Sequence, residues 1–569
     1  EWTWAGGSQQ ATATATATAT VSASNSVAVS SSSTSSSSPS PSPITLDQST
    51  LRMVDSYGRE KIFHGTNSIV KGPPWHPDYE TFSSDISMAG RDFDIMNDLG
   101  LNLLRLGVMW PGLEPSPGAY NETYLDQLYA IVDLAWEHGV YTLLDMHQDG
   151  LSEYFCGEGI PPWAVRHTAK FNANRGAFPA PFDSLNSTDY YCDPAFNGSP
   201  ELPSRNACAS KNLGPGHSET TMAAADAYQA LYTNVDGMLD AWAAAWTHVA
   251  SRFNGHPGVL GIELLNEPFA GDMYHHPLLM VPKPNPHNAD AVNLQPAYKV
   301  ITEAVRKVNE EVLIFFAGVT WGDLGAGFTA APDPKSILAF HYYSAPQFNV
   351  PLQFEAQARS GKSLGVGTFL TETSQPGPGQ TGFDEVGGIG DGADAALVGW
   401  AGFEWKSFCR DQDSGPDADA DSGAGPDADP DSSTASPASP SQLGQFGACK
   451  TGYSSNWDSD VPSEEFQSAN ARSYATAVAG HAVSMFYNVS NCDFELVYDS
   501  TDITTDENPT EIYVWGAGHY PSGLLITASA STSKGTVAVP AVWDGVSQVK
   551  VIASGLEEGT RISVRVSAV

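Results

Sequence analysis

The fold of this chain of 569 residues is best indicated by the stretch Gly261-Ile262-Glu263-Leu264-Leu265-Asn266-Glu267-Pro268. An apolar run leads into an Asn-Glu pair and stops at a proline, as in a buried parallel strand whose last residues emerge at the edge of a sheet. Enzymes built on closed parallel sheets keep their chemistry at that edge. The stretch therefore predicts an α/β domain with reactive side chains at the carboxyl ends of its strands.

Seven further strand-like runs alternate with helical patterns around this stretch. They cover residues 61–67, 101–108, 140–145, 312–317, 337–342, 365–370 and 397–403. Asn121 is placed to cap the helix that precedes Gly139. Eight strand-helix units running in one direction predict a (β/α)₈ TIM barrel. The alternative, an open doubly wound sheet, lacks the Gly-x-Gly-x-x-Gly signature after its first strand.

Composition divides the chain into four parts. Ala-Thr repeats and a serine-rich tract cannot form a core, and a second tract of Asp, Ala, Ser, Pro and Gly cannot either. Short alternating runs near the carboxyl terminus, such as Phe494 to Tyr498, are typical of a small antiparallel β-sandwich. The predicted parts are a disordered segment over 1–48, the barrel over 49–410, an acidic linker or loop over 411–445, and the sandwich over 446–569.

Charge and cysteine content limit the partners and the compartment. The formal charge is −38, from 27 Lys and Arg against 65 Asp and Glu, so the surface repels phosphate backbones and we expect no nucleic acid partner. Six cysteines without a Cys-x-x-Cys pair favour disulfides over a zinc or redox site. Together with sequons at Asn121, Asn186, Asn197 and Asn488, they predict a secreted or lumenal protein, extracellular or vacuolar. We expect a monomer.

Polar side chains gather where the predicted strands end. Those singled out are Asn67, Lys71, Arg105, His147, Asp149, Asn266, Glu267, His341, Tyr343, Glu372, Glu404 and Trp405. In a barrel these points converge on one mouth. Two glutamates that face each other there are what glycoside hydrolysis needs, one to protonate the leaving oxygen and one to attack carbon or activate water.

Several motifs, taken together, resemble glycoside hydrolase family 5. These are Asn266-Glu267-Pro268, Thr371-Glu372-Thr373 and Asp145-Met146-His147-Gln148-Asp149. The stretches His64-Gly65-Thr66-Asn67-Ser68 and Arg105-Leu106-Gly107-Val108-Met109-Trp110 narrow the resemblance to the endoglycoceramidases and their relatives. In the second domain, Arg472-Ser473-Tyr474 and His519-Tyr520-Pro521 are similar too. The likeness spans about residues 50–408 and 470–569.

The resemblance implies a role for each residue of the mouth. Glu267 would be the acid/base and Glu372 the nucleophile of a retaining mechanism, with their carboxyl groups about 5 Å apart. Arg105 and Tyr343 would hold Glu372 ionised and oriented, and Asn266 would bind the sugar 2-hydroxyl. The remaining hydroxyls of the glucose would be bound by Lys71, His147, Asp149 and His341.

One position departs from the family pattern. Relatives carry a tryptophan platform at the end of the eighth strand, where this chain reads Gly402-Phe403-Glu404-Trp405-Lys406. We predict that Phe403 takes the place of that tryptophan under the sugar. The alternative is that Trp405 takes this place after a local shift in register. His147 and Asp149 lack a third ligand at suitable spacing, so we expect neither a metal nor a cofactor.

The resemblance implies a glycolipid substrate. The expected activity is that of a retaining β-glycosidase that cleaves between glucose and the lipid of a glycosphingolipid, releasing oligosaccharide and ceramide. Such a substrate also admits transient contact with a membrane or micelle surface. The alternatives are a glucosylceramidase or steryl-β-glucosidase, then a β-1,4-endoglucanase, and, outside the enzymes, a carbohydrate-binding protein.

Overall fold

The computed structural model describes a large part of the chain. The described residues are 19–20, 43–84, 86–165, 178, 180, 182, 219–319, 325–343, 349–375, 383–406, 457–458 and 460–569. They fall into two compact units, Ser35–Arg472 and Ser473–Val569, the second grouped with Glu1–Thr34. Cys192, Cys208, Cys409 and Cys449 lie outside the described residues, as do Asn186, Asn197 and the predicted linker over 411–445.

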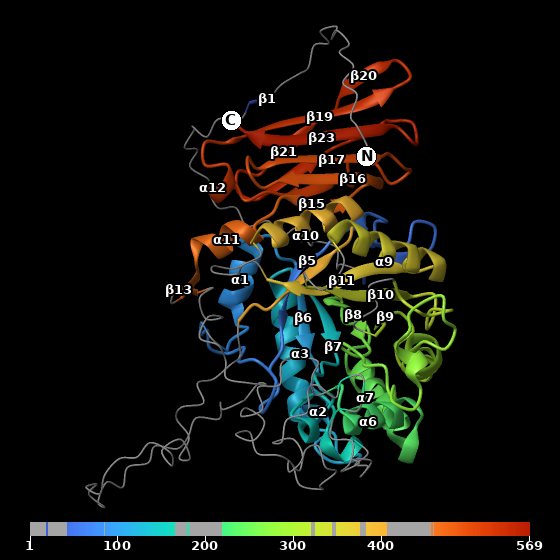
Figure 1. The fold of residues 1–569 in the computed structure, drawn as a ribbon. Coiled ribbons are helices and arrows are strands. Elements are labelled where there is room, and N and C mark those ends of the chain that lie inside the picture. Colours follow the sequence, from blue (N-terminus) through green and yellow to red (C-terminus); the bar gives the residue numbers. More distant parts are fainter. Residues whose placement is uncertain are drawn as a thin grey trace, which may run out of the picture. The chain divides into compact units, whose positions relative to one another are not determined.

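The first unit is a closed barrel of eight parallel strands, which confirms the predicted fold (Figure 1). The strands are β5 (His64–Ser68), β6 (Leu103–Gly107), β7 (Tyr141–Asp145), β8 (Val259–Glu263), β9 (Leu313–Ala317), β10 (Ser336–Tyr342), β11 (Gly367–Ser374) and β12 (Trp400–Phe403). Each strand pairs with its neighbour in sequence, and β12 closes the barrel against β5. Consecutive strand-helix units therefore surround the axis in chain order.

The part of the barrel interior away from the mouth is filled with apolar side chains. Leu103, Leu143, Leu260 and Phe315 are buried in one cluster there. Gly261 in β8 is needed for this packing, because a Cβ at that position would lie 2.6 Å from the ring of Phe315. The end of the barrel opposite the mouth is covered by the antiparallel strands β2 (Thr45–Asp47), β3 (Arg52–Val54) and β4 (Glu60–Lys61), whose buried residues include Leu46 and Met53. The described strands of the first unit thus start at Thr45, before the predicted residue 49, and β1 (Ala19–Thr20) is a strand within the segment predicted to be disordered.

Helices cover the outside of the barrel. They are α1 (Gly90–Asp98), α2 (Trp110–Leu113), α3 (Glu122–Glu137), α6 (Met222–Tyr232), α7 (Met238–Arg252), α8 (Gln295–Val305), α9 (Val350–Leu364), α10 (Phe383–Ala396) and α11 (Glu464–Asn470). Asn121 caps α3 as predicted, since its side chain accepts a hydrogen bond from the Tyr124 amide at 3.2 Å. Among the described residues, no helix combines the length and apolar character needed to cross a membrane.

The second unit is antiparallel. One sheet contains β16 (His481–Asn488), β17 (Asp493–Asp499), β23 (Arg561–Ala568), β19 (Leu524–Thr532) and β20 (Gly535–Ala538), and β1 (Ala19–Thr20) pairs with β19. The strands β15 (Tyr474–Val478), β18 (Thr510–Tyr513), β22 (Gln548–Val551) and β21 (Ala541–Trp543) pair in the other, and α12 (Gly516–His519) follows β18. Alternate residues of β17 and β23 are buried, as expected when one face of a sheet covers a core.

The two units divide later in the chain than the predicted residue 446. The division falls after Arg472, so β13 (Trp457–Asp458), β14 (Val461–Pro462) and α11 belong with the barrel. The reason is packing: Phe466 of α11 and Trp457 of β13 lie against Trp405, with ring centroids 5.8 Å and 5.3 Å away.

Candidate active site

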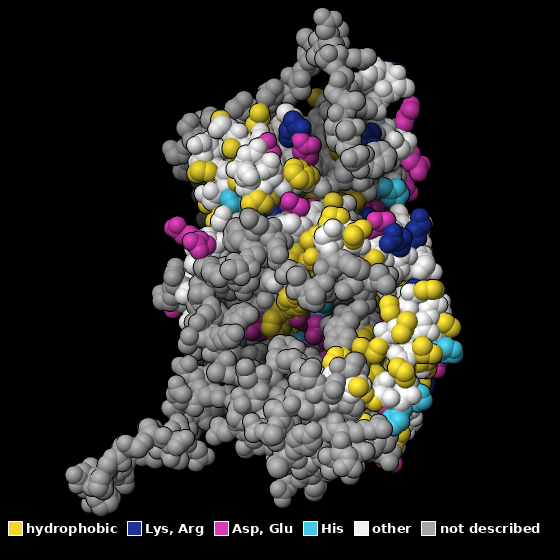
Figure 2. Space-filling model, viewed as in Figure 1, with side chains coloured by type: hydrophobic (Ala, Val, Ile, Leu, Met, Phe, Trp, Pro, Cys, Tyr) yellow, Lys and Arg dark blue, Asp and Glu magenta, His cyan; other side chains and the backbone are white. Residues whose placement is uncertain are grey.

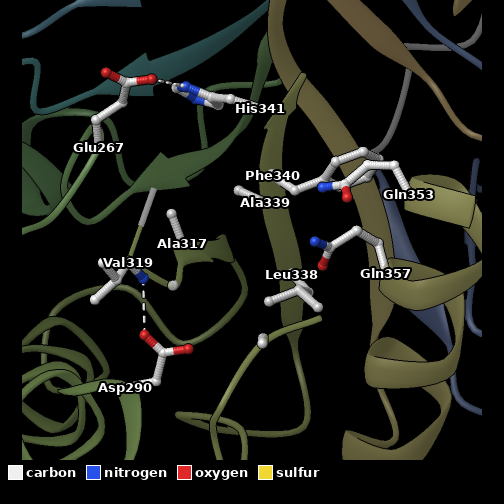
Figure 3. Close-up of a pocket in the computed structure, with 12 residues that line it drawn as sticks. Glu267, Asp290, Ala317, Val319, Leu338, Ala339, Phe340, His341, Gln353 and Gln357 are labelled. Atoms are coloured by element: carbon white, nitrogen blue, oxygen red, sulfur yellow. Dashed lines mark hydrogen bonds and ion pairs between the residues drawn. The ribbon is translucent and has the colours of Figure 1, made fainter. Parts of the chain in front are cut away.

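Glu267 lies just beyond β8, at the mouth of the barrel. Its backbone has a φ of 39°, in the left-handed region that non-glycine residues seldom adopt. Its Oε1 lies 2.8 Å from Nδ1 of His341, a contact drawn in Figure 3. The side chain of Glu267 is 23% exposed, so its carboxyl group can reach a bound molecule.

Glu372 lies on β11 and is more enclosed. The hydroxyl of Tyr343 donates a hydrogen bond to its Oε1, and Nη1 of Arg105 donates to its Oε2 at 3.1 Å. Each carboxylate oxygen therefore has a donor, and the two donors fix the orientation of the carboxyl group. Burial, followed by the charge of Glu372, raises the pKa of Tyr343 well above its ordinary value, which keeps this hydroxyl a donor at neutral pH.

Arg105 is fully buried on β6 and connects most of the floor of the site. Its Nε donates to Oε2 of Glu263 at 2.7 Å, and its Nη2 lies 3.1 Å from Asp145. Nη1 and Nη2 also donate to the side-chain oxygens of Asn67 and Asn266, each at 2.8 Å. Burial alone would lower the pKa of Arg105, but the three carboxylates raise it. Arg105 thus acts on Glu372 from below and does not face the open mouth.

The two glutamates are close enough for a covalent mechanism. One carboxylate oxygen of Glu267 and one of Glu372 lie within 4.8 Å of each other. Retaining glycosidases hold these groups about 5 to 5.5 Å apart, whereas inverting enzymes leave about 6.5 to 9.5 Å for a water molecule. The separation therefore fits a nucleophile paired with an acid/base.

A polar cluster lies beside this pair. Nζ of Lys71 contacts Oδ2 of Asp149, and Nε2 of His147 lies 3.3 Å from the same oxygen. Burial alone would lower the pKa of His147, but Asp149 and Asp145 raise it to about 10. The ring of Phe403 stacks on His147 with centroids 6.2 Å apart, and Nζ of Lys71 lies 5.3 Å from the Phe403 centroid. The structure thus brings Lys71, His147, Asp149 and Phe403 together.

His341 and Asn266 were expected to bind hydroxyl groups of the sugar, and in the structure both contact groups of the protein. His341 contacts Glu267 and has its Nδ1 3.9 Å from Glu372, so it lies between the two glutamates. Burial would lower its pKa, but Glu372 and Glu267 raise it. Asn266 is fully buried, and its Nδ2 donates to the carbonyl of Gln148 at 3.0 Å. The roles proposed for these residues toward substrate stay predictions.

Trp405 does not line the mouth, so its assignment to the substrate site is wrong. Its side chain is fully buried, and its Nε1 donates to Oδ1 of Asp92 at 2.9 Å. Residues two apart in a regular strand share a face, so the sequence pattern alone does not separate Phe403 from Trp405. The strand β12 ends at Phe403, and beyond it the two side chains take different directions. Phe403, which is partly exposed, is the aromatic side chain at this position of the mouth.

Glu158 and Glu219 were missed as site residues, and Glu404, singled out at the end of the eighth strand, was given no role toward substrate. Burial raises the pKa of Glu404 to about 8, and Oε2 of Glu404 has no hydrogen-bond partner among the described residues. Burial, opposed by Lys71 and reinforced by Asp149, raises the pKa of Glu158 to about 8. Burial and the charge of Glu267 raise the pKa of Glu219 to about 8. Glu404 follows the eighth strand, which was a usable signal, whereas Glu158 and Glu219 come from loops.

The described residues offer one group of side chains that could hold a metal ion. It consists of Glu267, His341 and Glu372, whose ligand atoms lie within 4.8 Å of one another. These are the residues that the two-carboxylate chemistry already uses. The predicted absence of a metal and of a cofactor stays a prediction.

A TIM barrel that carries this pair of glutamates at the ends of β8 and β11 defines a retaining glycoside hydrolase. Comparison with known families agrees. Residues 54–184 and 215–408 match Cellulase (glycosyl hydrolase family 5), and residues 472–566 match the glycoside hydrolase family 5 C-terminal domain. The chain belongs to glycoside hydrolase family 5.

Among its relatives are two proteins named endoglycoceramidase. One, from Cyanea nozakii, is 42% identical over 370 residues, covering 64% of this chain and 70% of that protein. The other, from Hydra vulgaris, is 36% identical over 491 residues, covering 84% of this chain and 82% of that protein. The solved structure of endo-glycoceramidase II from Rhodococcus sp. covers 93% of this chain and all of its own, with a TM-score of 0.60 and 20% identity. At that identity the structural likeness shows the fold alone.

Proposed function

We propose that this protein hydrolyses the bond between glucose and the lipid of glycosphingolipids, releasing an intact oligosaccharide and ceramide. The observation that carries the proposal is the pairing of Glu267 and Glu372 within 4.8 Å. The endoglycoceramidases from Cyanea nozakii and Hydra vulgaris, which align over most of their own length, support this substrate class.

The geometry gives each glutamate a step. In the first step Glu372 attacks the anomeric carbon of the glucose while Glu267 gives its proton to the departing ceramide oxygen. The carbon-oxygen bond to ceramide breaks, and an ester between the sugar and Glu372 forms. In the second step Glu267 takes a proton from water, whose oxygen attacks the same carbon and frees Glu372. The configuration at that carbon is therefore retained.

The surrounding side chains set up these steps. Arg105 and Tyr343 fix both oxygens of Glu372, so the attacking carboxylate is already oriented before substrate binds. On the sugar side, hydroxyl groups can replace the contact between Lys71 and Asp149 and can donate to Oε2 of Glu404, which has no partner among the described residues.

A glucosylceramidase is the second candidate. Relatives with that name match this chain over short segments, such as 76 residues at 36% identity in the protein from Rhizopus delemar. The two activities differ in product, because a glucosylceramidase releases free glucose. Ganglioside, glucosylceramide, steryl glucoside and cello-oligosaccharide should therefore be incubated with the enzyme in parallel, in detergent micelles where lipids require it.

Intact oligosaccharide together with ceramide from ganglioside supports the proposal. Free glucose as the first product from glucosylceramide, with ganglioside left intact, overturns it. The matched control is Glu372→Gln, which should lose about 10⁴-fold or more in kcat because the nucleophile is absent. If Glu372→Gln retains turnover within a few-fold, the covalent mechanism is wrong.

We further propose that the protein acts in an extracellular, vacuolar or other lumenal compartment. Asn121 and Asn488 are sequons within the described part of the chain, and Cys156 is disulfide-bonded whereas Cys492 is a free thiol. A disulfide is favoured by an oxidising compartment. Treatment of the native protein with an N-glycosidase should reduce its mass, and an unchanged mass would count against this compartment.

A further inference from the structure

We infer that the segment 273–292, after β8, is a docking loop that inserts apolar side chains into the lipid surface that carries the substrate. The docking loop has an unusual composition for this protein. Residues 273–289 contain no Asp or Glu, in a chain that holds 65 of them, and they include His275, His276, Lys283 and His287. Asp290, the one acid of the docking loop, is buried. This is a place where an acidic protein can approach a lipid surface without bringing carboxylates to it.

The outer side of the docking loop is apolar. Leu278, Val281 and Val292 are 51%, 44% and 41% exposed, so this one segment carries three of the exposed large hydrophobic side chains of the described residues. Figure 2 shows hydrophobic side chains gathered with histidines on one side of the barrel unit. Exposed aliphatic side chains beside a lysine and histidines, with no exposed acid within the loop, are typical of segments that lie in a lipid interface.

The inner side of the docking loop holds these side chains outward. Leu279 is buried in a cluster with Ala270 and Ala289. Nδ2 of Asn285 donates to the carbonyls of Leu278 and Val281, at 2.7 Å and 3.0 Å, and so links the two ends of the exposed turn. Since the backbone is tied down on both sides, the exposure of Leu278 and Val281 belongs to a formed surface.

The docking loop also adjoins the side of the site where the lipid leaves. Leu279 and Met280 line a cavity together with Asp290 and Val319. Asp290 and Val319 also line the neighbouring cavity that Glu267 and His341 border, as Figure 3 shows. Glu267 is the residue that protonates the departing oxygen, so ceramide departs on the side of the docking loop. A lipid surface held there would deliver substrate and take back product.

The lipid docking rests on the proposed function for its purpose, but it can be tested separately. The double variant Leu278→Ser and Val281→Ser removes the two exposed aliphatic groups of the docking loop. The matched control is Val542→Ser with Val546→Ser, which removes two valines of the second unit that are 58% and 66% exposed. Each protein is mixed with phosphatidylcholine vesicles, sedimented and quantified, and is assayed on a soluble aryl β-lactoside and on ganglioside in the same vesicles.

The expected result is that the docking-loop variant loses at least fivefold in vesicle binding and tenfold in kcat/KM on vesicular ganglioside. Its kcat/KM on the aryl lactoside stays within twofold, and the control variant behaves as the unmodified protein in all assays. Docking by this loop is overturned if the unmodified protein does not sediment with vesicles. It is also overturned if the docking-loop variant binds vesicles as well as the unmodified protein, or if the docking-loop variant and the control variant lose binding equally. The proposed function fails by a different readout, namely no oligosaccharide released from ganglioside in detergent micelles.

Discussion

Arg105 donates to Glu372 at 3.1 Å from beneath the site while its Nε is held by Glu263 at 2.7 Å. The guanidinium is therefore fixed by one carboxylate and fixes another. Lysine has the charge of arginine but no planar fork of donors. Arginine at this position thus supplies orientation as well as charge.

We predict that Arg105→Lys lowers kcat about 10²-fold, because a small displacement of a reacting group can cost that much. The KM for a soluble aryl lactoside should stay within about threefold, since Arg105 does not face the mouth. Steady-state kinetics on this substrate check both values. Arg359→Lys, whose side chain is 66% exposed, is the control and should leave both values unchanged. If Arg105→Lys raises KM by the same factor by which it lowers kcat, then Arg105 also binds substrate.

The fold could be predicted because the sequence repeats one simple signal. Apolar runs followed by polar residues mark all eight strands, and the predicted ranges overlap each strand from β5 to β12. Burial on both faces requires such runs in a parallel sheet, so the physical cause is strong and local. The positions of Glu267 and Glu372 follow from this pattern, because both lie at strand ends, whereas the roles predicted for them follow from the family resemblance.

The contacts across the barrel could not be read in the same way. Glu263 is buried inside the apolar run of β8, and only its unusual position hinted at a charged partner such as Arg105. Glu158 and Glu219 reach the site from loops whose path is set by tertiary packing, and nothing local in the sequence marks that path. The choice between Phe403 and Trp405 depended on where the eighth strand ends, because residues two apart share a face only while the strand stays regular.

Phe403 and Trp405 should therefore respond differently to substitution. We predict that Phe403→Ala raises the KM for lactosides about tenfold, since an aromatic contact contributes roughly 0.5 to 1.5 kcal/mol beyond the area it buries. Trp405→Phe should leave KM unchanged and lower the free energy of unfolding by about 1 to 3 kcal/mol, because Asp92 loses a buried donor. Kinetics and urea unfolding of both variants check this. A raised KM for Trp405→Phe would return that residue to the sugar site.

Glu404 makes the stability of the protein depend on pH. Burial raises its pKa from 4.5 to about 8, so the folded state holds the proton more tightly than the unfolded state. The stabilisation from this group is complete below pH 4.5 and is lost as the pH rises to about 8. Glu404→Gln keeps the neutral form at every pH. We therefore predict that its free energy of unfolding, relative to the unmodified protein, increases between pH 5 and pH 8 by at most about 1.4 kcal/mol per pH unit.

Urea unfolding at pH 5 and pH 8 measures this difference. Glu303→Gln is the matched control, because that side chain is 64% exposed on α8. The control should show the same pH dependence as the unmodified protein. If Glu404→Gln also shows no change with pH relative to the unmodified protein, Glu404 is not held neutral by burial.

The division of roles between Glu267 and Glu372 can be tested through the leaving group. A ceramide oxygen needs a proton as it departs, whereas a dinitrophenolate leaves without one. We predict that Glu267→Gln slows cleavage of ganglioside about 10² to 10⁴-fold, the usual contribution of a general acid. On dinitrophenyl β-lactoside the first step should slow by about tenfold or less, and a burst of dinitrophenolate should precede a slow phase, because the base for the second step is missing. Stopped-flow absorbance records the burst, and Glu372→Gln should give none. A burst from Glu372→Gln, with none from Glu267→Gln, would exchange the two roles.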